Sequence, residues 1–216
     1  MILDLEEEYT KKGLTIFSEH FNDLEFQEEE LIKSLNKLGK RERGIVIKAL
    51  EFASEKHKGQ YRPDVYRSPY IIHVIRVCRI LIEEAGITDT EIVISTLLHD
   101  VIEDCRVTEK DLEKQFGKKV TTLVKSVSQN SFPSRKSYML HFKKASKETK
   151  LMKICDRVDN LYSLLDKTLW KNKMILDYVT ETEKYVLPIA KVAPNLFQLL
   201  RQSVIDLKNI CGSGRI

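Results

Sequence analysis

Four ionisable side chains lie close together in the stretch Leu97–Asp104. It reads Leu-Leu-His-Asp-Val-Ile-Glu-Asp, so His99 and Asp100 are followed, after two aliphatic residues, by Glu103 and Asp104. On a helix of 3.6 residues per turn these side chains share one sector, where adjacent carboxylates repel and buried charges need a partner. A divalent metal ion is such a partner. The alternative is an acidic helix end in contact with solvent.

Two further helices carry candidate partners for this group. His73 borders the apolar stripe of a helix expected over 68–81, and Asp156 lies in an apolar run of a helix expected over 150–167. Each residue also has a structural alternative. A histidine on an apolar helix edge is often a core residue, and Asp156 has Arg157 beside it as an ion-pair partner. A metal site needs more ligands than the first stretch offers, and these two residues are the candidates.

Two expected loops carry basic residues that can reach an anionic substrate. Gln60–Pro69 is longer than most connections and holds Arg62, whose guanidinium can stack on a base or grip a phosphate, or can serve solubility alone. Ser128–Ser137 contains a proline and four serines, which favour a mobile loop, and it carries Arg135 and Lys136. Both loops are candidate binding loops.

The hydrophobic periodicity predicts an all-α fold. Apolar residues recur at three- and four-residue spacing, and no segment alternates with period two for long enough to be a strand. We expect residues 1–40 to form an N-terminal helical extension and residues 41–216 to form the main domain. Within that domain, the helix that follows the turn at Asp89 and Thr90 is expected to continue through Asp104.

The composition is that of a soluble globular protein. The 216 residues are 42% hydrophobic and 31% charged, and no apolar run approaches the roughly 18 residues that a membrane span needs. Acidic residues stand near the start of the chain where a signal peptide requires basic ones, so we expect a cytoplasmic protein. The four cysteines are far apart, which suggests neither a zinc-thiolate site nor a disulfide framework.

The charge is distributed unevenly along the chain. The formal net charge is +4, but the first thirty residues carry −8 and the remainder therefore +12. A basic main body suits an anionic ligand such as a phosphorylated nucleotide. Nucleic acid is the rival explanation, but the lysines are dispersed over helix faces and are not interleaved with aromatic residues. We therefore expect neither nucleic acid nor membrane as a partner, while a homo-oligomer stays open.

Five separated motifs together carry a family resemblance. In chain order they are His57–Arg62 (His-Lys-Gly-Gln-Tyr-Arg), Pro69–His73, Leu98–Asp104, Phe116–Gly117 and Lys153–Asn160 (Lys-Ile-Cys-Asp-Arg-Val-Asp-Asn). They resemble the hydrolase domain of the RelA/SpoT-homologue family, a branch of the HD-domain metal phosphohydrolases that removes pyrophosphate from the 3′ position of the alarmone ppGpp. The resemblance covers residues 41–194 and implies an HD-domain helical bundle with the metal site in a cleft between helices. Because the chain ends where longer members begin a synthetase domain, it resembles a stand-alone small alarmone hydrolase.

The resemblance also implies roles for individual residues. Those that match the family's metal ligands are His73, His99, Asp100 and Asp156, a set that typically holds one manganese ion. Mixed imidazole and carboxylate ligands also suit other divalent metals such as iron or zinc. Glu103 and Asp104 match the acidic pair that orients and deprotonates the attacking water. The substrate-binding candidates, from the resemblance and the two basic loops, are Lys58, Arg62, Arg135, Lys136, Asn160 and Tyr178.

The leading hypothesis is thus a manganese-dependent ppGpp 3′-pyrophosphohydrolase that degrades the alarmone of the stringent response. One rival is a phosphohydrolase that acts on another nucleotide, for example NADPH. A second rival is a nucleotide sensor that binds the alarmone without turnover. Glu103 and Asp104 argue against the sensor, because a binding protein needs no water-activating pair.

Overall fold

The computed structural model describes residues 20–165 and 170–212, which form a helical bundle. Within these ranges there is no β-strand, only one isolated bridge between Tyr61 and Pro69. The predicted all-α fold class is therefore confirmed. The α-helices are α2 (Leu24–Ser34), α3 (Lys40–Lys56), α4 (Ile71–Glu83), α5 (Thr90–Leu97), α6 (Val101–Cys105), α7 (Glu109–Val127), α8 (Arg135–His141), α9 (Lys147–Ser163), α10 (Asn172–Glu181) and α11 (Pro194–Gly212). Short 3-10 or π segments lie at 35–37, 129–131, 182–186 and 190–192.

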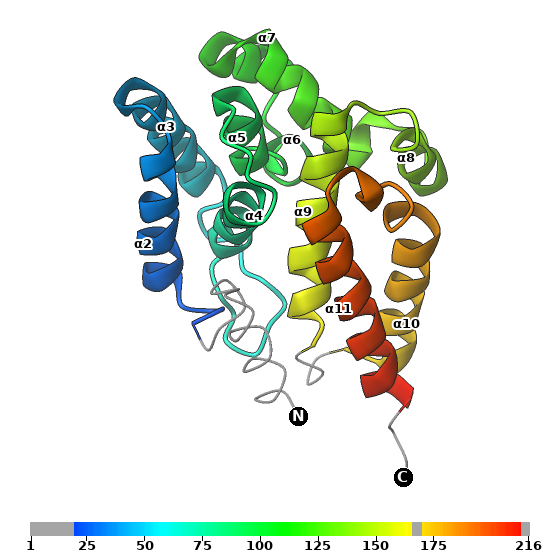
Figure 1. The fold of residues 1–216 in the computed structure, drawn as a ribbon. Helices are drawn as coiled ribbons and strands as arrows, with labels where there is room; N and C mark the ends of the chain where they lie inside the picture. The colour runs from blue at the N-terminus through cyan, green and yellow to red at the C-terminus, as the bar shows by residue number, and fades with distance from the viewer. Residues whose placement is uncertain (1–19, 166–169, 213–216) are drawn as a thin grey trace.

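Helix α4 lies in the middle of the bundle (Figure 1). Every residue from Ile71 to Ile82 is buried, and the helix packs against α2, α5 and α9. A helix that is covered on all sides belongs to the core, so its polar side chains must find partners inside the protein. His73, Arg76 and Arg79 are such side chains.

The remaining helices enclose α4 and hold α9 beside it. Helices α2 and α3 lie on one side of α4 in Figure 1, and α10 and α11 lie on the other side of α9. Helix α7 packs on both α5 and α9, and α11 packs along α9. This arrangement brings α4, the α5–α6 junction and α9 together, although they are far apart in the sequence.

The N-terminal residues that the structure describes are packed on the bundle. Asp23 caps α2 by accepting a hydrogen bond from the N–H of Phe26, and Phe21, Leu31 and Leu35 join the same apolar core as α4. Residues 1–19 of the expected extension lie outside the described residues. The division of the chain at residue 40 stays a prediction.

The expected single helix over 90–104 is wrong, because the chain turns between α5 and α6. The N–H of Leu98 still bonds to Ile94, but the N–H of His99 turns to the carbonyl of Thr96 at 3.5 Å. The His99 ring also bonds to that carbonyl, with Nδ1 2.8 Å from the oxygen. The ring nitrogen thus satisfies one of the carbonyls that the end of a helix leaves without an intrahelical partner. His99 and Asp100 therefore lie in a tight turn and not on a helix face.

The expected loop over 128–137 is also partly helical. A 3-10 turn spans Gln129–Ser131, and α8 begins at Arg135. The Ser134 hydroxyl accepts from the N–H of Ser137, and the Ser137 hydroxyl accepts from the N–H of Ser134, which is a reciprocal cap. Arg135 and Lys136 thus lie in the first turn of a helix, where the direction of each side chain is set by the backbone.

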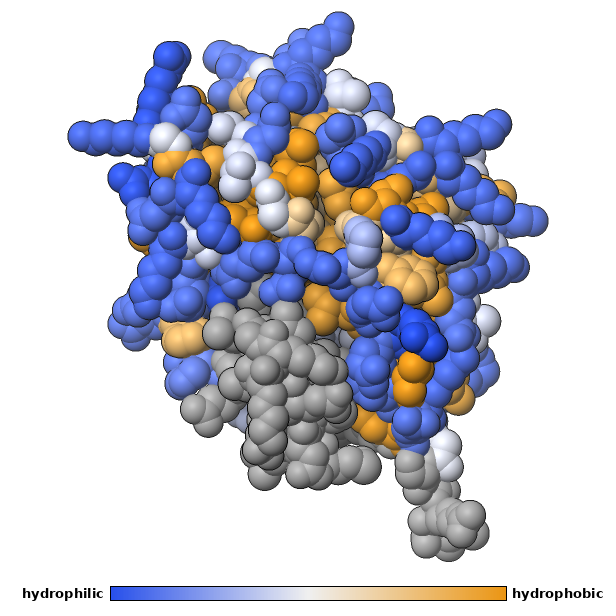
Figure 2. All heavy atoms as spheres, viewed as in Figure 1, coloured by the Kyte–Doolittle hydropathy of each residue, from blue (hydrophilic) through white to orange (hydrophobic). Residues whose placement is uncertain are grey.

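Hydrophilic side chains cover much of the face seen in Figure 2, with apolar surface between them. None of the helices in the described ranges has the length and apolar character to cross a membrane. The four cysteines, Cys78, Cys105, Cys155 and Cys211, are free thiols. This agrees with the expectation that they form no disulfide framework.

Candidate metal-dependent active site

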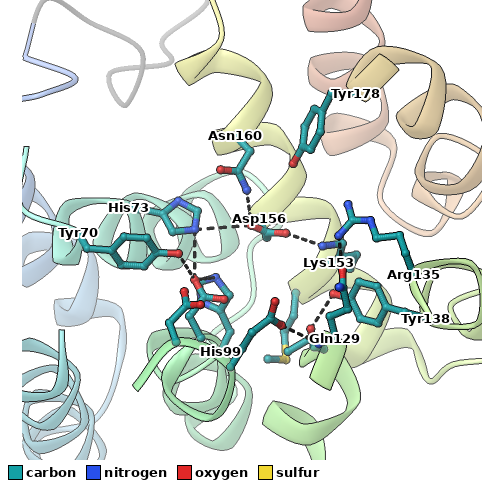
Figure 3. A pocket seen from close by; sticks show the side chains of 15 residues that line it. Tyr70, His73, His99, Gln129, Arg135, Tyr138, Lys153, Asp156, Asn160 and Tyr178 are labelled. Carbon is teal, nitrogen blue, oxygen red and sulfur yellow. Dashed lines mark hydrogen bonds and ion pairs between the residues drawn. The ribbon is translucent and has the colours of Figure 1, made fainter. Parts of the chain in front are cut away.

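A cavity of about 190 Å³ opens where α4, the α5–α6 turn, α8 and α9 meet (Figure 3). Most of the candidate residues from the sequence line it. They are His73, His99, Asp100 and Asp156 together with Glu103, Asp104, Arg135, Asn160 and Tyr178. Side chains from at least three separate stretches of the chain therefore converge on one space.

Both histidines turn the same ring nitrogen away from the cavity. Nδ1 of His73 lies 2.6 Å from Oδ2 of Asp159, and Nδ1 of His99 lies 2.8 Å from the carbonyl oxygen of Thr96. A carbonyl or an ionised carboxylate can only accept, so both Nδ1 atoms must donate. In a neutral ring Nε2 then carries the lone pair. Both lone pairs belong to the nitrogens that face the acidic cluster.

The Nε2 atoms lie among carboxylate oxygens. Nε2 of His73 is 3.5 Å from Oδ1 of Asp156 and 3.6 Å from Oδ2 of Asp100, and Nε2 of His99 is 3.0 Å from the same Asp100 oxygen. One donor atom each from His73, His99 and Asp156 lies within 4.8 Å of the other two. Asp100 is tied into the cluster by the hydroxyl of Tyr70, which donates to Oδ2 at 2.8 Å.

The donor set fits a divalent metal ion. Nε2 of His99 is buried and has no hydrogen-bond partner, although a carboxylate oxygen lies 3.0 Å away. Two acceptors that face each other at this distance require a cation or a proton between them. Two imidazole nitrogens and two carboxylates with room for water form a ligand set that manganese, iron or zinc accepts. The cluster therefore has the chemistry of a metal centre.

Lys153 is the charged partner of Asp156. Its Nζ donates to Oδ2 at 2.7 Å, and Nδ2 of Asn160 donates to Oδ1 at 2.5 Å. The alternative pairing with Arg157 is wrong, because Arg157 lies on another face of α9 and bonds to Glu181 at 2.8 Å. Burial acts to raise the pKa of Asp156, but Lys153 and His73 outweigh it and hold the pKa well below its usual range. Asp156 is therefore ionised, as a ligand must be.

Glu103 and Asp104 lie at the edge of the cavity in α6. Oε2 of Glu103 accepts a hydrogen bond from the backbone N–H of Gln129 at 2.6 Å. Burial raises the pKa of the Glu103 carboxyl against this bond, and burial together with Asp100 raises the pKa of Asp104. Both carboxylates thus have a higher proton affinity than exposed ones, which suits the abstraction of a proton from water.

Arg62 connects the loop after α3 to α9. Its Nη2 donates to Oδ1 of Asn160 at 2.9 Å and to the hydroxyl of Ser163 at 3.4 Å, and its guanidinium carbon lies 5.7 Å from the centre of the Tyr70 ring. Asn160 in turn contacts Asp156. Arg62 therefore lies two hydrogen bonds from a candidate metal ligand.

Arg135 and Tyr178 meet around Glu181. Arg135 donates to both oxygens of Glu181, at 2.6 and 2.9 Å, and Arg157 donates to one of them. Tyr178 stacks on Arg157, whose guanidinium carbon is 3.9 Å from the ring centre. Burial acts to raise the pKa of Glu181, but the two arginines outweigh it and lower the pKa to about 2. Of these residues, Arg135 and Tyr178 line the cavity, on the side where Lys153 also lies (Figure 3).

Three of the basic candidates do not line the cavity. Arg62 is connected to it through Asn160, whereas Lys58 and Lys136 are not. Lys58 is exposed, follows the end of α3 and lines a separate depression between α2 and α3. Lys136 is exposed and, one residue after Arg135 on α8, points about 100° away from it.

Several residues that sequence reasoning missed take part in the site. Lys153 precedes Asp156 by three residues, a helical spacing that predicts contact, so its role was open to prediction. Tyr70 directly precedes the helix that carries His73, but its partner Asp100 lies 30 residues away, so no local spacing predicted the contact. Gln129 and Asp159 had no local signal either, because their partners lie 26 and 86 residues away in the sequence.

Comparison with known proteins finds a family that matches the chain, relatives of similar sequence and a solved structure of similar fold. Residues 49–182 match the family described as HD domain. The chain is 36% identical over 140 residues to guanosine-3′,5′-bis(diphosphate) 3′-pyrophosphohydrolase MESH1 of Xenopus tropicalis, across 62% of this chain and 78% of that protein. It is 32% identical over 163 residues to the Mus musculus protein of the same name, across 73% and 91%.

A solved structure is similar over most of its length. It is described as a metazoan orthologue of SpoT that hydrolyses ppGpp and plays a role in starvation responses. The TM-score is 0.66 at 34% sequence identity, and the match covers 74% of this chain and 93% of that one. The sequence match to the Mus musculus protein and the structural match cover nearly the same share of this chain, 73% and 74%.

Proposed function

The chain belongs to the HD domain family, and from this premise we propose that it is a metal-dependent hydrolase that removes pyrophosphate from the 3′ position of ppGpp and pppGpp. The observation that carries the proposal is the unpartnered Nε2 of buried His99, which faces three further ligand side chains beside Glu103 and Asp104. Relatives that are 36% and 32% identical to this chain carry the name of that activity.

One divalent ion, which we propose to be manganese, would be held by His73, His99, Asp100 and Asp156. When bound, it supplies Lewis-acid chemistry that polarises a phosphate oxygen and acidifies water. The ligand set alone also admits iron or zinc. Lys153 donates to Oδ2 of Asp156, so Oδ1 is the oxygen directed towards the proposed metal ion.

Glu103 takes the proton of the attacking water. The water oxygen forms a bond to the phosphorus that is attached to O3′, the O3′–P bond breaks, and the 3′ oxygen leaves as a hydroxyl once it is protonated. The products are pyrophosphate and the nucleoside 5′-diphosphate or triphosphate. Asp104, which lines the same cavity, orients the water, and the proton that Glu103 has taken passes to the leaving 3′ oxygen.

Cationic side chains neutralise the phosphates. Lys153 and Arg135 line the cavity, and positive charge placed where negative charge develops is the main electrostatic requirement of phosphoryl transfer. Asn160 lies on the side of Asp156 away from Lys153, where the sugar and base of a nucleotide would extend. Arg62 bonds to Asn160 and is therefore placed to contact that part of the substrate. The guanidinium of Arg62 is planar and can stack on a purine.

We place this activity in the cytoplasm. The four cysteines are free thiols, and free thiols persist in a reducing compartment. Two of them, Cys78 and Cys155, are buried in the core, where burial raises the pKa of each thiol and makes it unreactive.

The experiment that tests the proposal separates substrate from metal. Metal-stripped protein is reloaded in turn with manganese, iron, zinc or magnesium and given ppGpp, pppGpp or NADPH, while pyrophosphate and phosphate are measured separately. We expect pyrophosphate from ppGpp and pppGpp with manganese. Phosphate from NADPH without pyrophosphate from ppGpp would overturn the substrate assignment. Tight binding of ppGpp without turnover under any metal would assign a sensor.

A further inference from the structure

Asp159 lies directly behind a candidate metal ligand and outside the cavity. Its side chain is 0% exposed, and Oδ2 accepts the hydrogen bond from Nδ1 of His73 at 2.6 Å. Arg76, 1% exposed, binds both of its oxygens, with Nε 2.6 Å from Oδ1 and Nη2 3.1 Å from Oδ2. Asp159 does not line the cavity, and its carboxylate is connected to the candidate ligands through the His73 ring.

Arg76 is itself held by the residues that precede α2. Its Nη1 donates to the backbone oxygen of Phe21 at 3.0 Å, and the Phe21 ring lies with its centre 3.7 Å from the guanidinium carbon. Phe21 also packs on Tyr162 of α9, at 4.6 Å between ring centres. The ion pair is therefore sealed from water by a segment more than fifty residues away in the sequence.

The geometry at His73 sets which ring nitrogen faces the metal ligands. His73 has carboxylates on both sides, Asp159 at 2.6 Å from Nδ1 and Asp156 and Asp100 at 3.5 and 3.6 Å from Nε2. A neutral ring has one N–H, and either side can accept it. The shorter contact, made by a carboxylate that Arg76 holds in place, keeps the proton on Nδ1. Nε2 then keeps its lone pair for a metal, as in other metal sites whose histidines are oriented from behind.

We propose that Asp159, with Arg76, is a positioning residue of the metal centre, and that Phe21 and its neighbours form the outer wall of that centre. The segment before α2 thus contributes to metal affinity as well as to packing. This inference rests on the proposed metal centre. It adds Asp159, Arg76 and Phe21 to that centre, none of which lines the cavity.

The first test changes Asp159 and measures metal affinity. Asp159→Asn keeps the shape but offers one acceptor oxygen to three N–H groups from Arg76 and His73, so His73 loses its fixed partner. Isothermal titration of metal-stripped protein with Mn²⁺ should show binding 10- to 100-fold weaker than in the wild type, roughly the loss that outer-shell changes produce at other metal sites. Urea unfolding of the same samples reports stability separately.

The chain offers a matched control one turn further along α4. Arg79 is buried and bonds to both oxygens of Glu83, at 2.9 and 3.1 Å, in the same bidentate manner, but Glu83 contacts no candidate ligand. We expect Glu83→Gln to reduce the free energy of unfolding while Mn²⁺ affinity stays within about threefold of the wild type. An equal loss of affinity in both variants would show a general effect of stability and overturn the proposal.

A second pair of variants serves if Asp159→Asn does not fold. Phe21→Ala removes the ring from the Arg76 guanidinium but leaves the backbone oxygen in place, and we expect Mn²⁺ binding to weaken threefold to tenfold. Phe26→Ala is the control, because its ring stacks on His20 at 4.5 Å. Wild-type affinity in Asp159→Asn, or in Phe21→Ala where Asp159→Asn does not fold, would overturn the inference. Wild-type protein that binds no metal would instead overturn the proposed function.

Discussion

Replacing Glu103 by glutamine separates chemistry from binding in this site. Oε2 of Glu103 accepts one backbone hydrogen bond, from Gln129 at 2.6 Å, and glutamine keeps an oxygen that can accept it. Glu103 is not among the candidate metal ligands, so the metal site should be intact. The substitution removes one negative charge and the ability to accept a proton, and little else.

The magnitude follows from the role of a general base. Such groups contribute about 10²- to 10⁴-fold to a rate, which corresponds to roughly 3 to 5 kcal/mol in the activation barrier. We expect kcat for ppGpp to fall by that factor in Glu103→Gln. The Kd for ppGpp should be unchanged or lower, because a carboxylate that repels the substrate phosphates is gone.

The pH dependence gives a second signature of the same residue. A base works only when it is deprotonated, so activity is lost as pH falls through its pKa. Burial raises the pKa of Glu103, which moves this acid limb to higher pH than an exposed glutamate would give. In Glu103→Gln, the fall in activity at low pH that Glu103 causes should be absent from the pH profile of the residual activity.

The assay combines steady-state pyrophosphate release, equilibrium binding of ppGpp and metal content by elemental analysis. Glu109→Gln is the control, since Glu109 lies on α7 in an exposed pair with Lys125 at 2.8 Å and should leave all three quantities unchanged. The reasoning is refuted if kcat for Glu103→Gln stays within fivefold of the wild type, or if the loss of activity is accompanied by loss of metal.

Three further predictions concern other parts of the site. Asp156→Ala should abolish both metal content and hydrolysis, and stoichiometric metal with full activity in the purified variant would contradict the ligand assignment. Arg62→Ala should raise KM for ppGpp about tenfold or more while a small phosphodiester is hydrolysed nearly as before, because Arg62 is expected to contact the base; equal loss on both substrates would assign it to the fold. Glu181→Gln should cost about 1 to 2 kcal/mol of unfolding free energy at pH 7, because partly exposed hydrogen bonds from Arg135 and Arg157 are weakened. The pKa of Glu181 is lowered from 4.5 to about 2 in the fold, so this difference should shrink as pH falls from 4.5 to 2, and a constant difference in urea unfolding would refute it.

The types of ligand and the helical class were open to prediction from the sequence. Two pairs of site residues, His99 with Asp100 and Asp156 with Asn160, stand close together in short local patterns. The apolar periodicity of α9 indicates its buried face, whereas α4 is buried on all sides, Arg76 and Arg79 included. Local patterns suffice for these features because they depend on contacts within one or two helical turns.

The turn at His99 shows where local reasoning failed. The pattern of apolar residues continues smoothly from Ile92 to Ile102, and it predicts one helix. The helix ends at Leu97, and the His99 ring bonds to the carbonyl of Thr96 in the turn that follows. The apolar pattern of the sequence does not show this turn. Likewise the Ser134 cap turned an expected loop into the start of α8.

By itself the sequence determined which donor atoms are available, that helices carry most of them, and the charge of the surrounding chain. Only the tertiary structure decided which donors meet. His73 and Asp159 are 86 residues apart, Glu103 and Gln129 are 26 apart, and Arg135 and Glu181 are 46 apart. Such contacts depend on how α4, α6, α8 and α9 cross, and the crossing is set by the burial of apolar faces along whole helices, which no short pattern encodes.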